Sequence, residues 1–256
     1  MAFCLFSPQD YQVFQRNESN EGSVIFSGTV SCEITHFTVE IFEEISQEKI
    51  EDITWEHQQE SHFFLQMVLP AGGWYIARIF AFSKHDKSLI SLRFGVGEVF
   101  IIAGQSNSTN YGEELSEQSS GMVACFAANT WSLAKDPLPG AHDMSSGGSP
   151  WLFFGDVLSK KLCVPVGIAI TGHGGTKIKE WLPNDEYHGQ SEEKKGLFNW
   201  LMIRIQQLGL QGFRALLWHQ GESDVGNGTK QDDYFCRLKT IIAKRVNNAS
   251  GIFLGL

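Results

Sequence analysis

The sequence has little basic charge and no long apolar run. Its 256 residues contain 20 lysines and arginines against 29 aspartates and glutamates, a formal net charge of −9. This balance lacks the excess of cations that neutralises phosphate groups, so neither a nucleic acid nor an anionic membrane surface is expected as a partner. No apolar stretch reaches the ~18 residues that a membrane-spanning helix needs. The composition, 42% hydrophobic and 19% charged, is that of an ordinary globular protein.

Cysteine is also scarce and widely scattered, at positions 4, 32, 125, 163 and 236. No pair has the spacing of a zinc site, so no structural metal is predicted, and we expect reduced, mostly buried thiols. The first seven residues, Met1 to Ser7, lack a basic region, and their apolar run is too short for a signal peptide. We therefore expect a cytoplasmic location.

Two halves of the chain differ in the period of their apolar residues. In the first half, apolar positions alternate with polar ones, as at Phe37, Val39 and Ile41, and turn-forming residues separate the runs. Alternation of this kind is typical of strands with one buried face. We expect residues 1–95 to form a small all-β sandwich of immunoglobulin-like type.

After Gly95, continuous apolar runs alternate with helical patterns. The runs cover residues 99–103, 164–170, 215–218 and 252–254, and residues 151–158, 197–208 and 235–245 repeat with helical spacing. Continuous runs are typical of parallel strands buried on both faces. This alternation predicts an α/β domain with a parallel sheet over residues 96–256.

Unusual residues follow three of these predicted strands, where open α/β sheets carry their sites. Ser106 follows the first strand and can expose its hydroxyl at a helix N-terminus, where N–H groups favour developing negative charge, although a serine there more often caps a helix. Gly174 and Gly175 follow the second and can offer backbone N–H groups to an oxyanion, or form a plain turn. Gln220 and Glu222 follow the third and can donate to that oxyanion and orient a histidine, or form a polar helix-capping loop.

Together these three segments resemble the signature blocks of a known family. The blocks are Gly104-Gln105-Ser106-Asn107, Gly174-Gly175-Thr176-x-Ile178-x-x-Trp181 and Gln220-Gly221-Glu222-Ser223. They are similar to those of sialate O-acetylesterase-like and acetylxylan-esterase-like proteins, which are carbohydrate esterase family 6 and its relatives in the SGNH-hydrolase superfamily. The resemblance covers about residues 96–256 and implies a flavodoxin-like parallel sheet.

This resemblance implies a serine esterase that removes O-acetyl groups from carbohydrates without a cofactor. Ser106 would attack the acetyl carbonyl and form an acetyl-enzyme, and Glu222 would support the catalytic histidine. The backbone N–H groups of Ser106 and Gly175 and the side chain of Gln220 would hold the oxyanion. Gln105 and Gly174 are further expected oxyanion or substrate-binding residues.

The sequence departs from the family at the catalytic histidine. The family carries it in an Asp-x-x-His element near the C-terminus, and no histidine follows His219 here. Three explanations stand: a chain truncated at Leu256, a catalytically inactive relative, or a substitute among His142, His173 and His219. Strand alternation predicts that His219 points away from the side that Gln220 faces.

A non-catalytic carbohydrate-binding or interaction protein is therefore the alternative function. Seven tryptophans are available to stack on sugars, but most, such as Trp74 and Trp200, lie in apolar patterns typical of a core. The sequence identifies neither the acetylated sugar nor the oligomeric state.

Overall fold

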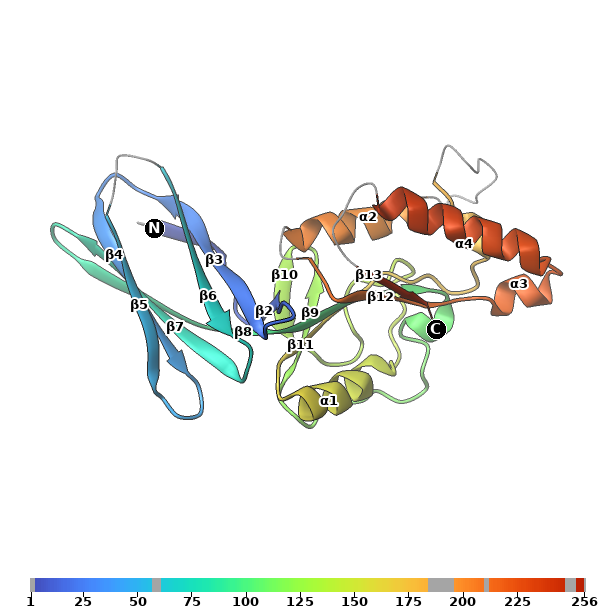
Figure 1. Ribbon diagram of the computed structural model, residues 1–256, viewed down its shortest axis with the longest axis horizontal. Helices are drawn as coiled ribbons and strands as arrows, with labels where there is room; N and C mark the ends of the chain where they lie inside the picture. The colour runs from blue at the N-terminus through green and yellow to red at the C-terminus, as the bar shows by residue number, and fades with distance from the viewer. Residues whose placement is uncertain (1–2, 57–60, 184–195, 210–211, 247–251, 256) are drawn as a thin grey trace.

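A computed structural model describes residues 3–56, 61–183, 196–209, 212–246 and 252–255. An all-β part and an α/β part lie side by side along the long axis of the molecule (Figure 1). The strands of the first part are β1 (Phe3–Ser7), β2 (Gln12–Gln15), β3 (Glu21–Val30), β4 (Ile34–Glu43), β5 (Lys49–Glu56), β6 (His62–Pro70), β7 (Trp74–Ser83) and the first half of β8 (Lys87–Gly104).

The all-β part consists of two sheets packed on one core, antiparallel except where the short β2 pairs parallel with β8. One sheet has the order β1-β3-β6, and the facing strands run β8-β7-β4-β5. Phe26 from the first sheet and Phe37 and Phe94 from the second are fully buried in one apolar cluster between them. Alternate residues face this core, as the burial pattern of β3 shows. The expectation of an all-β N-terminal part is confirmed.

Strand β8 joins the two parts without a break. Its 18 residues pair antiparallel with β7 as far as Gly95, and from Glu98 onward they pair parallel with β11 (Val166–Ile170). The boundary expected between residues 95 and 96 therefore falls inside a continuous strand. The change from alternating to continuous apolar residues marks the point where β8 leaves the sandwich and becomes buried on both faces.

The second part is a mixed sheet with helices on both faces. Its remaining elements are the 3₁₀ helices η1 (Ser106–Ser108) and η2 (Ile178–Trp181), the strands β9 (Val123–Ala127), β10 (Thr130–Leu133), β12 (Ala215–His219) and β13 (Ile252–Gly255), and the helices α1 (Trp151–Leu162), α2 (Leu197–Gln207), α3 (Glu222–Gly226) and α4 (Gln231–Val246). Figure 1 shows α1 on one face and α2 and α4 on the other.

The strand order corrects the purely parallel sheet expected from the sequence. The strands β11-β8-β12-β13 are parallel neighbours, which is the start of the flavodoxin order. Beyond β11 lies β9, also parallel, and β10 then pairs antiparallel with β9. This short hairpin was not predicted. It turns at Ala128 and Asn129, which both have positive φ.

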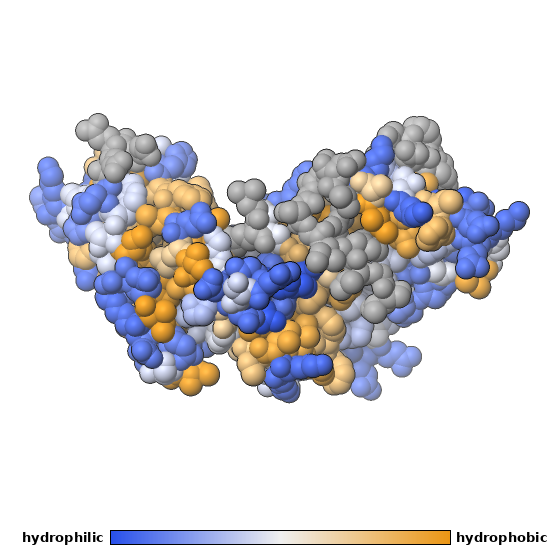
Figure 2. Space-filling view, in the orientation of Figure 1, coloured by the Kyte–Doolittle hydropathy of each residue, from blue (hydrophilic) through white to orange (hydrophobic). Residues whose placement is uncertain are grey.

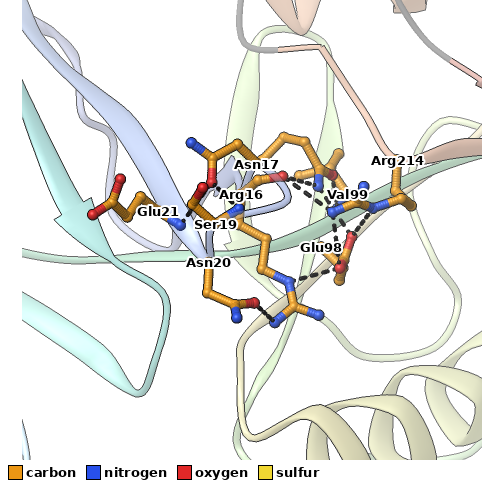
Figure 3. A network of polar contacts seen from close by, with 9 residues as sticks. Arg16, Asn17, Ser19, Asn20, Glu21, Glu98, Val99 and Arg214 are labelled. Atoms are coloured by element: carbon orange, nitrogen blue, oxygen red, sulfur yellow. Dashed lines mark hydrogen bonds and ion pairs between the residues drawn. The ribbon is translucent and has the colours of Figure 1, made fainter.

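A buried ion-pair network ties the two parts together at the start of the parallel segment of β8 (Figure 3). Glu98 is 4% exposed and accepts hydrogen bonds from Arg16 Nε at 2.7 Å, Arg214 Nε at 2.7 Å and Gln15 Nε2 at 3.0 Å. Burial opposes ionisation of Glu98, but these hydrogen bonds outweigh it and hold the pKa of the carboxyl below its usual 4.5. The network therefore holds an ionised carboxylate at the junction.

The surface exposes most of the cysteines and carries an apolar area over α1. Only Cys125 is buried, while the other four cysteines are exposed, so the prediction of mostly buried thiols is wrong. Apolar surface gathers over α1 (Figure 2), where Phe153 and Val157 are exposed. Among the described residues, no helix is both long and apolar enough to cross a membrane.

Candidate active site

The three sequence blocks meet because they follow three adjacent parallel strands. β8 lies between β11 and β12, with Ile102 opposite Ile170 and Gly104 opposite His219. The backbone N–H of Gln105 continues the ladder by donating to the His219 carbonyl at 2.9 Å. Parallel strands end at one edge of their sheet, so the loops that carry Ser106 and Gln220 leave the sheet side by side.

Ser106 begins η1 at this edge, half-buried, and lines a cavity of about 550 Å³. Asn107, Tyr111, Trp151 and His219 are among the other lining residues. This helix is a single 3₁₀ turn without a side-chain cap, and Ser106 is its first residue, so Ser106 is not the expected N-cap. A polar hydroxyl on a partly apolar concave wall is the usual form of a small-molecule site.

Glu222 contacts two of the residues that line this cavity. Its Oε1 accepts a hydrogen bond from Asn107 Nδ2 at 2.7 Å, and the same oxygen lies 3.7 Å from His219 Nε2. The side chains of His219 and Glu222 are 50% and 45% exposed. His219 therefore has an acidic neighbour and faces the cavity that Ser106 lines. The sequence indicated Asn107 only as a member of a block. In the structure its side chain connects Glu222 to the loop that carries Ser106.

Gln105 acts inside the protein rather than at the cavity. It is buried, and its Oε1 accepts hydrogen bonds from the backbone N–H groups of Gly221 at 3.3 Å and Ser223 at 3.1 Å. The residue expected to bind oxyanion or substrate thus fixes the loop after β12 against the loop after β8. It positions Glu222 relative to Ser106.

The side-chain amide of Gln220 also points into the protein. Its Nε2 donates to Asp224 Oδ2 at 2.6 Å and to the Thr176 carbonyl at 2.8 Å, and it also lies 3.3 Å from Gln105 Oε1. Asp224 is 2% exposed and also accepts from the backbone N–H of Ile178 at 2.7 Å. In this geometry the amide ties the loop after β12 to the loop after β11. The buried Asp224, which sequence reasoning missed, directs it there.

The two adjacent glycines, Gly174 and Gly175, differ in their local structure. The backbone N–H of Gly174 donates to Asp143 Oδ2 at 2.6 Å, so that group is occupied by the protein itself. Gly175 has φ of +66°, in the left-handed region that favours glycine. Asp143 was not singled out from the sequence, and no spacing rule marks it, because the chain brings it to Gly174 only through the fold.

His142 and His173 form a pair of their own beside this loop. Their Nδ1 atoms lie 2.8 Å apart, so one donates and the other accepts. Burial, together with the neighbouring His173, lowers the pKa of His142 below its usual 6.5. Neither residue is among those that line the Ser106 cavity. Of the three histidines considered as substitutes for the missing one, His219 is the one that the structure places on that cavity.

The sequence of residues 96–250 matches the SASA family, described as carbohydrate esterase, sialic acid-specific acetylesterase. The chain belongs to this family. The resemblance drawn from the three blocks is thereby confirmed, and the matched segment contains each of them. Membership identifies the chain as a carbohydrate esterase relative and leaves its own activity and substrate as proposals.

Two known proteins are similar to this chain. A probable carbohydrate esterase of Arabidopsis thaliana is 26% identical over 164 residues, covering 55% of this chain and 59% of that protein. The crystal structure of a carbohydrate acetylesterase from Xanthomonas citri matches 98% of this chain and 60% of its own, with TM-score 0.51 and 17% identity, which supports the fold. The chain thus spans about three fifths of the length of both relatives.

Proposed function

We propose that this family member is a serine esterase that removes O-acetyl groups from carbohydrates, with Ser106 as the nucleophile. The observation that carries the proposal is the position of Ser106. It lies at the carboxyl end of a central parallel strand and lines a cavity of about 550 Å³. A cavity of this size suits a sugar-sized ligand. Asn107 and His219 line the same cavity, and Glu222 contacts both of them.

The reaction divides into two displacements. Ser106 Oγ attacks the acetyl carbonyl carbon and loses its proton to a base. The bond between that carbon and the sugar oxygen breaks, and the sugar oxygen takes the proton. Water then attacks the acetyl-enzyme and releases acetate. The backbone N–H of Ser106 would meet the oxyanion, and a well-aimed donor of this kind contributes about 2.7–4 kcal/mol to the transition state.

Two sources of the general base make different predictions. Within the described residues, His219 lines the same cavity as Ser106, and its Nε2 lies 3.7 Å from Glu222 Oε1, so His219 is one candidate for the base. The family resemblance implies instead an Asp-x-x-His histidine, which this sequence lacks after Glu222. In the first case His219→Gln abolishes hydrolysis by the 256-residue chain, and in the second it leaves the rate unchanged.

The proposal is tested by acetate release from acetylated sugars and by hydrolysis of an aryl acetate. We expect Ser106→Ala to lower kcat at least about 10³-fold, because the nucleophile is lost while folding is unaffected. Ser91→Ala is the matched control, because Ser91 is exposed in the first half of β8 and is not among the residues that line the cavity. Equal hydrolysis by wild type and Ser106→Ala, above the rate in buffer, would exclude Ser106 as the nucleophile.

A further inference from the structure

A second cavity opens at the same edge of the sheet, between α2 and the loop that precedes His142. It has a volume of about 540 Å³, and Trp200, Ile203, Arg204 and Gln207 of α2 line one side. Residues 139–141 and the turn after β9 line the other. It shares no lining residue with the Ser106 cavity. Trp200, expected in the core, is half-buried here and forms part of a wall.

Arg204 is a buried cation without a counter-charge among the described residues. The residue is 3% exposed, and its Nη1 donates to the Phe126 carbonyl at 3.0 Å, while its buried Nε has no partner. Burial alone lowers the pKa of its guanidinium, with no carboxylate acting against it. The guanidinium lies 5.6 Å from the ring centre of Phe126 and 5.9 Å from that of Trp200, and these contacts offset only part of the hydration that its charge has lost. A bound anion would offset the rest.

The neighbours of Arg204 indicate which kind of anion fits. The Oε1 of Gln207 is buried and has no hydrogen-bond donor among the described residues, so it suits a ligand hydroxyl. The Trp200 ring offers a flat apolar wall, and its Nε1 is held by the Gly140 carbonyl at 3.2 Å. A planar carboxylate matches the fork of N–H groups on a guanidinium. The set therefore favours a carboxylate on a hydroxylated, ring-shaped ligand.

The second cavity is linked to the Ser106 side by one short segment. Ala141 lines the cavity, the next residue is hydrogen-bonded to His173, and Asp143 holds the N–H of Gly174. On its other side, Gly174 lies against the ring of Tyr111, which lines the Ser106 cavity, so the loop after β11 contacts residues of both cavities. A ligand bound in one cavity is therefore separated from the other cavity by only a few residues of this loop.

We infer that the cavity between α2 and residues 139–141 is a binding site for a carboxylate, and that Arg204 receives the carboxylate of a hydroxylated organic acid. A sugar acid supplies both the carboxylate and the hydroxyl groups. Free acetate supplies the carboxylate alone. The site is separate from Ser106, and its occupation requires no hydrolysis.

Calorimetric titration of the 256-residue chain with three probes tests this assignment. Glucuronate and glucose form a matched pair, because they share the ring and differ in a carboxylate, and acetate supplies the carboxylate without the ring. We expect glucuronate to bind at one site per chain and to alter Trp200 fluorescence, and glucose to bind at least about tenfold more weakly. If acetate binds as tightly as glucuronate, Arg204 still binds an anion, but the inference that the ligand is hydroxylated is wrong. No saturable binding of either acid would overturn the proposal.

Two sets of variants locate the site. Ile203 is 48% exposed at the cavity rim, so Ile203→Glu and Ile203→Gln should both fold. The added carboxylate of Ile203→Glu should repel the ligand and weaken glucuronate binding severalfold relative to Ile203→Gln. Arg204→Met should weaken it at least about tenfold, with circular dichroism showing that the variant is folded. Unchanged binding in both Ile203→Glu and folded Arg204→Met would place the acid elsewhere and contradict the assignment. Because the readout is binding, the result is independent of whether Ser106 is a nucleophile.

Discussion

Polar groups are buried and paired at one end of the parallel segment of β8, and partly exposed at the other. At one end, Glu98 is buried and each of its carboxylate oxygens is taken up by guanidinium or amide donors. At the other end, just after Gly104, Ser106 faces a cavity, and Glu222 and His219 are about half exposed. The strand between them is apolar and fully buried. One end of the strand therefore contributes to stability, and the other is free for chemistry.

This difference has a physical cause. A charge removed from water must find partners in the protein, and Glu98 finds them across the junction of the two parts. Near the cavity, the groups that do find internal partners, Gln105, Gln220 and Gly174 N–H, act as supports that fix the loops. The groups with remaining access to the cavity are the ones available to a substrate.

Removing the carboxylate at the junction should give the largest loss of stability. Glu98→Ala leaves the guanidinium groups of Arg16 and Arg214 without their shared anion, so we expect a loss of about 3 kcal/mol, or roughly 6–12 °C in melting temperature. Activity per folded molecule should persist. Thermal unfolding followed by circular dichroism measures the effect.

Lys49→Met is the matched control for that experiment. Lys49 pairs with Glu40 and Asp52 on the surface of the sandwich, and exposed pairs of this kind contribute little. Its melting temperature should stay close to that of the wild type. A loss as large as that of Glu98→Ala would contradict the distinction between buried and exposed ion pairs.

Gly104→Ala should disturb the opposite end of the strand. Gly104 has φ of +133°, and a Cβ there would lie 1.9 Å from the His219 carbonyl oxygen. The backbones of β8 and β12 must then separate, at a cost of about 1–3 kcal/mol, and Ser106 moves with them. We expect a fall in kcat larger than the fall in stability explains, measured by kinetics at a temperature where the variant is folded. Full activity would mean that the close approach does not position Ser106.

Acid should weaken the junction through Glu98, and this is the smallest of the expected effects. The pKa of Glu98 is held below 4.5 in the folded protein, so its contribution is complete above the unfolded pKa and is lost as the pH falls through the folded value. The difference in unfolding free energy between wild type and Glu98→Gln should be constant above about pH 5.5 and shrink below pH 4.5. Urea unfolding across this range measures it. A difference that does not change with pH would show that ionised Glu98 has no special role.

The sequence predicted the elements whose apolar pattern is strong. The alternation around Phe37, the continuous run ending at Ala103 and the helical spacing after Leu197 all correspond to observed strands and helices. The β9–β10 hairpin was missed because its strands have five and four residues and turn without a glycine. The continuity of β8 was missed because a change in periodicity was read as a boundary.

The site was predictable as a set of loops but not as a set of contacts. The order of strands brings the loops of Ser106 and Glu222 together, and the three blocks identified both. The direction of the Gln220 amide depends on Asp224, and the occupation of Gly174 N–H depends on Asp143. Such pairings arise from tertiary packing, so single-sequence patterns do not reveal them.

The most direct measurement is to label the protein with a fluorophosphonate and map the modified residue by peptide mass spectrometry. Such a reagent reacts with a serine that is activated as a nucleophile. We expect a single label on Ser106, absent in Ser106→Ala and retained in Ser91→Ala. Hydrolysis of acetylated sugars by a chain whose label lies on another serine would contradict the assignment of Ser106 as the nucleophile.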